Sequence, residues 1–248
     1  MRACRAETVI ATIEAARAEL GDTEHPAGTV RIASAASAVP AILLPIMRQL
    51  RDHHPRIEVA ISEAEPAEVV QRLQDDDDLG IVYDYSIRPR FVPDGQGTVL
   101  IGHEPIYLVA PADAGVRGPI ERPADLLQVS SATWITNARG VEDDELTSRL
   151  CGLAGFKPRM VHRADSYELL GQMVAAGLGV AFVPALALAH APDGVACQRL
   201  AGIPVRRRIF LLTRPGRADC PPVAMVRTLI REEASRLAEV GPADLVAR

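Results

Sequence analysis

The clearest hydrophobic pattern in the chain lies between residues 165 and 184. Its apolar side chains recur at the spacing of one helix face: Leu169, Leu170, Met173, Val174 and Leu178. Residues 180–183 follow as an uninterrupted apolar run before Pro184, which is typical of a strand covered on both faces. The pattern therefore predicts a helix that leads into a buried strand.

Residue types also mark the two ends of this helix. Asp165 is a good N-cap, and Glu168 stands three residues later, where its side chain can return to the amide of the cap residue. Gly177 and Gly179 tolerate the left-handed turn that ends a helix. The first amides of the helix have no acceptor within it. This end is therefore either a site for a carboxylate or phosphate, or a terminus that Asp165 satisfies by itself.

Residues 29–83 show a pattern of strand, helix, strand, helix and strand. Strands are predicted near residues 30–34, 57–61 and 79–83, and helices near 39–50 and 69–73, the first kinked if Pro45 lies within it. Such a βαβαβ unit forms a parallel sheet, and ligands collect at the carboxyl ends of its strands. Ser34 and Ser37 fall at that edge, and we expect Ser37 to be the N-cap of the helix that follows.

A second α/β series begins near Trp134. It comprises a strand at 134–136 that ends in Asn137, a helix at 142–152, a strand at 160–163 and the helix and strand described above. Extended runs are predicted at 106–110 and 205–213, a long helix at 222–240, and an amphipathic helix at 3–20 followed by a linker at 22–28. The fold class is therefore α/β, with two units joined by two extended segments.

Composition and charge narrow the class of protein. The 248 residues are 48% hydrophobic and 24% charged, which is ordinary for a globular protein, and the formal net charge is -5. An acidic chain is not built to neutralise many phosphates, so we do not expect it to grip nucleic acid by itself. The first 20 residues mix charges throughout and contain neither a signal-peptide core nor a membrane span, which predicts a cytoplasmic protein without a membrane partner.

Several motifs, in this order, resemble the effector-binding portion of LysR-type transcriptional regulators over roughly residues 27–240. They are Val-Arg-Ile-Ala-Ser at 30–34, Leu-Leu-Pro at 43–45, His-His-Pro-Arg-Ile-Glu-Val at 53–59, Asp-Leu-Gly-Ile-Val at 78–82, His-Glu-Pro-Ile-Tyr-Leu-Val-Ala-Pro at 103–111 and Met-Val-Ala-Ala-Gly-Leu-Gly-Val-Ala-Phe-Val-Pro at 173–184. The last is the most specific. Each motif alone would be weak, but their order and spacing carry the resemblance.

The resemblance implies a fold of two Rossmann-like subdomains joined by two crossover strands, like type 2 periplasmic binding proteins. It implies the end of a linker helix and a linker at 1–26, subdomain I at 27–104, subdomain II at 105–207 and a return to subdomain I at 208–248. Family members carry a winged helix-turn-helix ahead of the linker helix, and this sequence opens inside what looks like that helix. We therefore expect a homodimer or homotetramer that contacts DNA only through a winged helix-turn-helix outside this chain.

The resemblance also implies which residues line a ligand cleft between the subdomains, namely Ser34, Ser37, Asn137 and Ser166. The short polar side chains suit hydrogen bonds to a small polar effector that bears a carboxylate, while ordinary capping and turn chemistry is the alternative reading. Thr136 and Asp165 adjoin these positions. Tyr83 and Phe182 would form walls of the cleft if they are not core residues. We expect no catalytic residue, no metal and no cofactor.

Other features have plainer interpretations. Cys151 and Cys197 are either structural thiols or a peroxide-sensing pair, and the family often has a glycine where this chain has the acidic run 75–78, which we expect to be a solvated loop. Arginines 206–208 are expected at exposed positions around a strand. The alternative function is a stand-alone solute-binding protein or an enzyme on the same fold, but no Ser/His/Asp set or metal cluster can be assembled.

Overall fold

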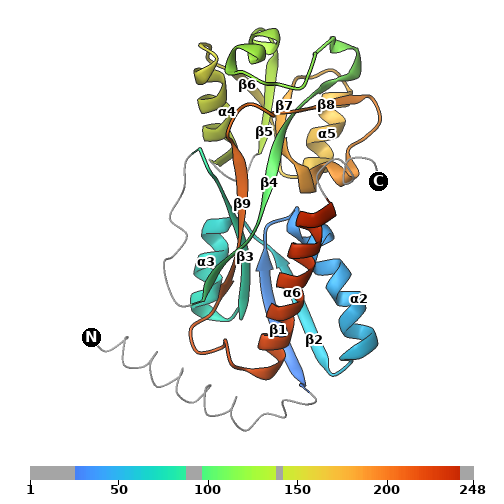
Figure 1. Cartoon of the computed structure of the whole chain (residues 1–248), viewed down its shortest axis with the longest axis vertical. Coiled ribbons are helices and arrows are strands. Elements are labelled where there is room, and N and C mark those ends of the chain that lie inside the picture. Colours follow the sequence, from blue (N-terminus) through green and yellow to red (C-terminus); the bar gives the residue numbers. More distant parts are fainter. Residues whose placement is uncertain (1–25, 88–96, 138–141, 241–248) are drawn as a thin grey trace, which may run out of the picture. The chain divides into compact units, whose positions relative to one another are not determined.

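A computed structural model describes residues 26–87, 97–137 and 142–240 (Figure 1). The predicted helix at 3–20 and most of the predicted linker lie outside these residues. The described chain divides into two compact units. The first holds the residues up to Tyr83, those from 97 to Gly102, and Ile209–Glu239, and the second holds those that begin at Asp84 together with His103–Arg208.

The first unit contains the predicted parallel sheet. Its strands are β1 (Gly28–Ser34), β2 (Ile57–Glu63) and β3 (Leu79–Tyr85), and β1 lies between the other two, parallel to both. Helices α2 (Leu44–His53) and α3 (Pro66–Asp75) make the crossovers. β3 is buried at every residue, as its continuous apolar sequence predicts for a central parallel strand. The predicted βαβαβ order of residues 29–83 is therefore confirmed.

The start of the first crossover differs from the prediction. A π-helical segment η1 (Val39–Leu43) runs directly into α2, and Pro45 is the second residue of α2. Proline lacks an amide hydrogen, and the first turn of a helix is where that loss costs nothing. The cap position of η1 is held by Ala38, without a side-chain hydrogen bond. The prediction that Ser37 is the N-cap is therefore wrong.

The long helix α6 (Pro221–Val240) belongs to the first unit up to Glu239. Its buried side chains recur at helical spacing and include Val223, Val226, Leu229, Ile230 and Ala234. The predicted helix at 222–240 and its apolar side are thus confirmed.

The second unit is a mixed structure. Strands β5 (Thr133–Asn137) and β6 (Arg159–Ala164) form a parallel pair, and the helices α4 (Glu142–Leu153) and α5 (Tyr167–Ala175) follow one strand each. In contrast, β4 (Thr98–Pro111) pairs antiparallel with β7 (Ala181–Pro184) and with β8 (Val195–Arg199). Short helical turns complete this unit, at Ala112–Ala114 (η2), Pro123–Val129 (η3) and Ala185–His190 (η4).

The α5–β7 segment has the predicted form but a different cap. The hydroxyl of Ser166 accepts a hydrogen bond from the amide of Leu169 at 3.2 Å, so Ser166 is the N-cap and the prediction of Asp165 is wrong. The two residues are adjacent and both suit the position, and the backbone of Ser166 has the extended conformation of a cap. Gly177 has a φ of +78°, as the predicted helix stop requires. β7 is buried at all four residues.

Strand β9 (Arg206–Thr213) joins β4 in connecting the two units, because each has residues in both. β9 lies between β3 and β4 in the order of hydrogen-bonded strands. Of the three arginines expected at exposed positions, Arg206 is exposed, but Arg207 is buried and Arg208 is only partly accessible. The expectation is wrong for Arg207, because its guanidinium has a buried carboxylate partner in Glu104.

The acidic run 75–78 is also only partly what the sequence predicts. Asp75 and Asp76 are exposed, but Asp77 and Asp78 are buried. Asp78 accepts hydrogen bonds from the Arg31 amide at 3.0 Å and from the guanidiniums of Arg214 and Arg217 at 3.1 and 2.8 Å. The second half of the run is therefore an internal anchor for the start of β3 and not a solvated loop.

Candidate functional site

The parallel pair β5–β6 brings four of the predicted site residues to one edge of the second unit. Asn137 ends β5, and its Cα is paired with that of Ala164, which ends β6. Asp165 and Ser166 follow Ala164 directly, and Thr136 precedes Asn137. Because parallel strands end on the same side of a sheet, these residues share the carboxyl edge from which α5 begins. Asp165 and Ser166 are exposed there, whereas Thr136 and Asn137 are buried.

Ser166 caps the start of α5, the end at which the helix dipole is positive. Ser166 satisfies the amide of Leu169 through its hydroxyl, and its carbonyl accepts from the amide of Leu170 at 3.0 Å. The amides ahead of Leu169 have no acceptor inside the helix, and the helix dipole is positive at this end. A helix start of this kind favours a hydrogen-bond acceptor, and Ser166 is exposed at it.

Arg163 is the charged group of this edge, and sequence reasoning missed it. Its guanidinium donates to both carboxylate oxygens of Asp144, at 2.9 and 2.7 Å, to the hydroxyl of Thr136 at 3.2 Å and to the carbonyl of Asn137 at 3.3 Å. A signal was present, because Arg163 lies at the end of the strand predicted at 160–163. Its carboxylate partner lies in α4 and cannot be read from local spacing.

The contacts with Arg163 set the charge of the edge. Burial raises the pKa of Asp144, but hydrogen bonds from Arg163 and Thr136 outweigh this and hold the pKa below its usual value. The same hydrogen bond raises the pKa of Arg163. Both groups are therefore ionised at neutral pH and neutralise each other. Thr136 has its hydroxyl engaged with both, so it positions the pair instead of offering that group to a ligand.

In the first unit, Ser34 and Ser37 lie at the carboxyl edge of the sheet, but both are buried. Ser34 ends β1, has no exposed surface and donates its hydroxyl to the carbonyl of Ala35 at 3.2 Å. The Ser34 carbonyl accepts from the amide of Ala64 at 3.0 Å. The position at the strand end is as predicted, while the hydroxyl of Ser34 is engaged locally.

The two aromatic residues proposed as cleft walls are core residues. Tyr83 is 7% exposed, and its hydroxyl donates to Glu65 at 3.1 Å. Phe182 is 5% exposed and packs on Trp134 with ring centroids 4.8 Å apart. Both therefore support the units from within.

A further polar contact lies close to the start of α4. The hydroxyl of Tyr85 donates to Asp143 at 2.7 Å, and both side chains are buried. This pair joins the end of β3 to α4 within the second unit. It lay beyond sequence reasoning, because the two residues are 58 positions apart.

Cys151 and Cys197 lie in surroundings that disfavour the thiolate form. Burial raises the pKa of Cys151 to about 12, and it raises the pKa of Cys197 as well. A thiol that stays protonated is a poor nucleophile toward peroxide. Cys151, Cys197 and Cys220 are free thiols, and Cys197 packs against the apolar core of the second unit. Burial therefore favours the structural interpretation of these two thiols.

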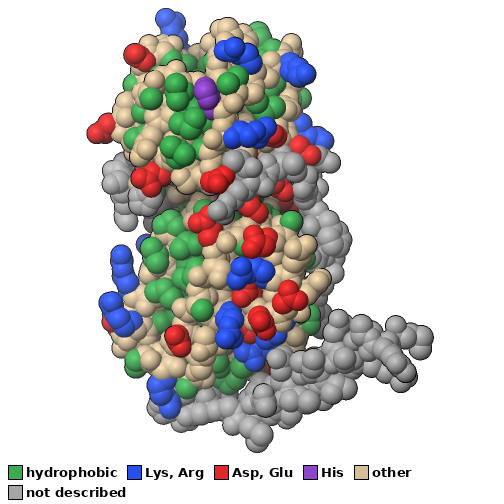
Figure 2. All heavy atoms as spheres, turned by 180° about the vertical axis from the view of Figure 1, so that it is seen from behind, with side chains coloured by type: hydrophobic (Ala, Val, Ile, Leu, Met, Phe, Trp, Pro, Cys, Tyr) green, Lys and Arg blue, Asp and Glu red, His purple; other side chains and the backbone are tan. Residues whose placement is uncertain are grey.

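Within residues 26–87, 97–137 and 142–240, no group of three or more His, Cys, Asp and Glu side chains is placed to hold a metal ion. Over the same ranges, every helix is too short or too polar to span a membrane. On the face shown in Figure 2, basic and acidic side chains are interspersed, and hydrophobic patches lie between them.

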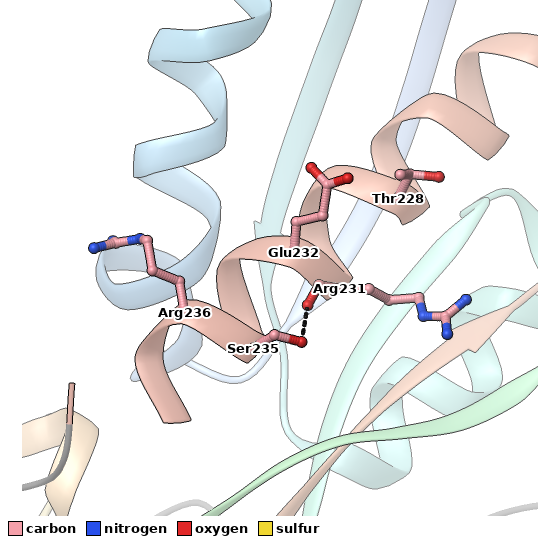
Figure 3. A pocket seen from close by; sticks show the side chains of 5 residues that line it. All are labelled: Thr228, Arg231, Glu232, Ser235 and Arg236. Atoms are coloured by element: carbon pink, nitrogen blue, oxygen red, sulfur yellow. Dashed lines mark hydrogen bonds between the residues drawn. The ribbon is translucent and has the colours of Figure 1, made fainter. Parts of the chain in front are cut away.

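A surface pocket of about 470 Å³ lies along one side of α6 (Figure 3). Its lining residues all come from this helix, namely Thr228, Arg231, Glu232, Ser235 and Arg236. Ser235 donates its hydroxyl to the carbonyl of Arg231 at 2.9 Å, an ordinary contact within a helix. The pocket contains none of the predicted site residues, and its lining side chains are all polar or charged.

Comparison with known proteins defines the class. The family described as LysR substrate binding domain matches residues 23–235. The chain is 24% identical over 189 residues to the transcriptional activator IlvY of Salmonella typhimurium, covering 75% of this chain and 59% of IlvY. It is 26% identical over 237 residues to a probable hydrogen peroxide-inducible genes activator of Streptomyces viridosporus, covering 93% of this chain and 73% of that protein.

Solved structures agree on the fold. A cysteine mutant of Corynebacterium glutamicum OxyR matches with a TM-score of 0.72 and 19% identity, over 95% of this chain and 73% of that chain. The reduced form of the regulatory domain of Vibrio vulnificus OxyR2 matches with a TM-score of 0.63 and 18% identity, over 84% of this chain and 96% of that chain. The fold is thus the α/β fold of these regulatory domains, which is like that of type 2 periplasmic binding proteins.

The chain belongs to the family of LysR substrate-binding domains, the effector-binding part of LysR-type transcriptional regulators. The sequence resemblance to this family is confirmed. The relatives in the comparison are transcriptional activators and not enzymes. The chain spans 59% of the length of IlvY, so the properties of a whole regulator are matters for proposal.

Proposed function

We propose that this chain senses a small polar metabolite that carries a carboxylate, and that the carboxylate binds at the start of α5. The observation that carries the proposal is the β5–β6 register, which sets Asn137 beside Ala164 and so places it next to the first residues of α5. The amides at that helix start suit a carboxylate oxygen, and the exposed Ser166 hydroxyl lies beside them.

The charge at this edge makes the fit specific. Arg163 is already paired with Asp144, so an incoming carboxylate would meet backbone dipoles and the Ser166 hydroxyl beside the acidic side chains of Asp165 and Glu168. Neutral hydrogen-bond donors hold a carboxylate weakly enough to exchange at metabolite concentrations. This is suited to a sensor, which must release its effector when the concentration falls.

The proposed mechanism is a shift between two populated arrangements of the chain. An effector changes that balance only through a difference in its affinity for the two arrangements. We propose that the subdomains run from 27 to 104 and from 105 to 207, with a return at 208–248, and that residues 1–26 belong to a linker helix and linker. DNA binding would come from a winged helix-turn-helix outside this chain.

We also propose that the working protein is a cytoplasmic homodimer or homotetramer without catalytic activity. Cytoplasmic placement follows from the role of a DNA-binding regulator. Symmetric oligomers are the usual way in which such a protein would read a two-fold symmetric DNA site.

Two substitutions at Ser166 test the carboxylate site. Ser166→Asp keeps an N-cap side chain and hence the stability of α5, but its negative charge would repel a carboxylate. Ser166→Ala removes the cap and should cost about 1 kcal/mol of stability. A thermal-shift screen of aromatic and aliphatic carboxylates would first identify a ligand, since a ligand at one hundred times its Kd stabilises by about 2.7 kcal/mol.

The expected result is that Ser166→Asp melts like the wild type and loses the thermal shift given by that carboxylate. Leu169→Ala, at an exposed apolar position on the same helix, is the matched control and should keep the shift. If only neutral compounds raise the melting temperature, or if Ser166→Asp retains the full shift, the carboxylate site at α5 is wrong.

A further inference from the structure

Two ion pairs with buried carboxylates lie where the chain passes between its units. Among the described residues, the unit changes after Tyr83, after Gly102, after Arg208 and, at the last residue of α6, after Glu239. Asp84, Glu104, Arg207 and Arg208 each lie within two residues of one of these points and belong to the second unit. We call these four residues the crossing clamp.

The pair Glu104–Arg207 joins β4 to β9. Arg207 donates from Nε to Glu104 Oε1 at 2.6 Å, and its Nη2 lies 2.5 Å from the same oxygen. The other carboxylate oxygen of Glu104 accepts from the amide of Leu186 at 2.7 Å. Both side chains are at most 5% exposed. Glu104 therefore ties together β4, β9 and the turn that follows β7.

The pair Asp84–Arg208 joins β3 to β9. Arg208 donates from Nε and Nη2 to the two carboxylate oxygens of Asp84, at 2.7 and 2.6 Å, in the parallel geometry that suits guanidinium and carboxylate. The side chain of Asp84 is 2% exposed and that of Arg208 is 29% exposed.

The two pairs act on opposite faces of one strand. Arg207 and Arg208 are consecutive in β9, and successive side chains of a strand point to opposite sides. β9 lies between β3 and β4 in the hydrogen-bonded order. Arg207 connects β9 to β4 on one face, and Arg208 connects β9 to β3 on the other. Through these pairs, β9 is held to both β3 and β4 by residues of the second unit.

We propose that the crossing clamp is a conformational device that makes the connecting strands part of the rigid second unit and confines backbone bending to the residues just outside it. Removal of one partner of a buried pair leaves an uncompensated charge, so the pairs resist separation when the strands are stressed. Gly102 lies on the outer side in β4, and a Cβ there would meet no atom within 4 Å. This position has both the backbone freedom and the space to bend. The proposal does not depend on the identity of the effector.

Residue-resolved amide hydrogen exchange on the full chain tests the clamp. In the wild type, amides at 104–110 should exchange at least tenfold more slowly than those at 98–102, which belong to the same strand. Glu104→Gln should raise exchange at least tenfold at 104–110 and 206–208 while leaving β1 unchanged. Asp144→Asn is the matched control, since it breaks another ion pair of the second unit that is remote in sequence from the connecting strands, and it should leave those amides unchanged.

A second variant keeps the test valid if Glu104→Gln does not fold. Glu104→Met with Arg207→Met removes both charges and fills the same space, a change that buried ion pairs often tolerate. We expect this double variant to fold and to show the same local rise in exchange. Equal protection on both sides of Gly102 in the wild type would overturn the proposal. So would equal effects of Glu104→Gln and Asp144→Asn, or a uniform rise in exchange over the whole chain.

Discussion

Arg163 and Asp144 form a two-point ion pair, with the guanidinium nitrogens 2.9 and 2.7 Å from the two carboxylate oxygens. The pair connects the end of β6 to the first turn of α4, at the edge where α5 also begins. It is the main charged contact of the candidate site in the second unit, and the charges of its two side chains cancel. The first prediction follows from the pKa of its carboxylate.

Asp144 should make the stability of the protein depend on acid pH. Its pKa in the folded chain lies below the usual value near 3.9, so its contribution is complete above about pH 5 and is lost as pH falls through the folded pKa. Because the side chain of Arg163 is 48% exposed, solvent screening limits the contribution to roughly 1 kcal/mol. Asp144→Asn should therefore melt lower than the wild type at pH 7, and the two should converge below pH 4.

The convergence is the informative part of that measurement. Asp113→Asn, at an exposed aspartate of the same unit, provides a control with little expected change at either pH. A difference between wild type and Asp144→Asn that stays constant from pH 7 to pH 3 would mean that the carboxylate charge is not what stabilises this contact.

Asp78 should be among the most sensitive carboxylates of the first unit. It is 1% exposed and accepts from one backbone amide and two arginines, so Asp78→Asn leaves two partly buried guanidiniums without their counter-charge. We expect a loss of about 3–5 kcal/mol in the free energy of unfolding, measured by urea denaturation. The neighbouring Asp76 is exposed, and Asp76→Asn should change stability by no more than about 0.5 kcal/mol. Similar losses for both variants would refute the anchoring role.

Gly179 should tolerate no side chain. A Cβ at this position would lie 2.4 Å from the carbonyl oxygen of Thr133, which is backbone and cannot rotate away. Gly179→Ala should therefore cost about 1–3 kcal/mol and separate β7 from β5. At Gly152, near the end of α4, a Cβ would meet no atom within 4 Å, so Gly152→Ala should be neutral or stabilising by up to about 1 kcal/mol. A neutral Gly179→Ala in thermal unfolding would show that the strands can move apart freely.

Cys151 should be inert in the folded protein. With a pKa of about 12, only about one thiol in ten thousand is ionised at pH 8, and the side chain has no exposed surface. Mass spectrometry after treatment with peroxide or a maleimide should find Cys151 unmodified under native conditions and modified after denaturation. A Cys151–Cys197 disulfide formed by mild peroxide in the native state would revive the redox interpretation.

Much of the fold was readable from local pattern. The apolar run at 79–83 and the helical spacing at 69–73 predicted β3 and α3, because burial repeats every two or 3.6 residues along one element. The glycine at 177 predicted the stop of α5, because only glycine adopts its backbone conformation without strain. β8 and the antiparallel pairing of β4 were not predicted, since strand pairing depends on partners far along the chain.

The sequence predicted where the candidate site residues lie relative to the strands, but not which side chains they contact. Asn137 and Ser166 fall at strand ends, as the order of elements requires. Arg163 was missed, because an arginine shows nothing in sequence about which carboxylate it will meet. At the start of α5, two adjacent residues both suited the cap, and only the backbone conformation of Ser166 decided between them.

The sequence by itself determined most of the elements and their order, because hydrophobic spacing within an element is local. It also determined the family, through the order of motifs between residues 30 and 184. The tertiary structure decided which charges are buried. Arg207 and Asp78 read as exposed residues, yet each is buried against a partner 103 and 136 positions away, Glu104 and Arg214. A charged side chain leaves water only when its counter-charge is already in place. That condition is met by the folded chain as a whole and by no segment of it alone.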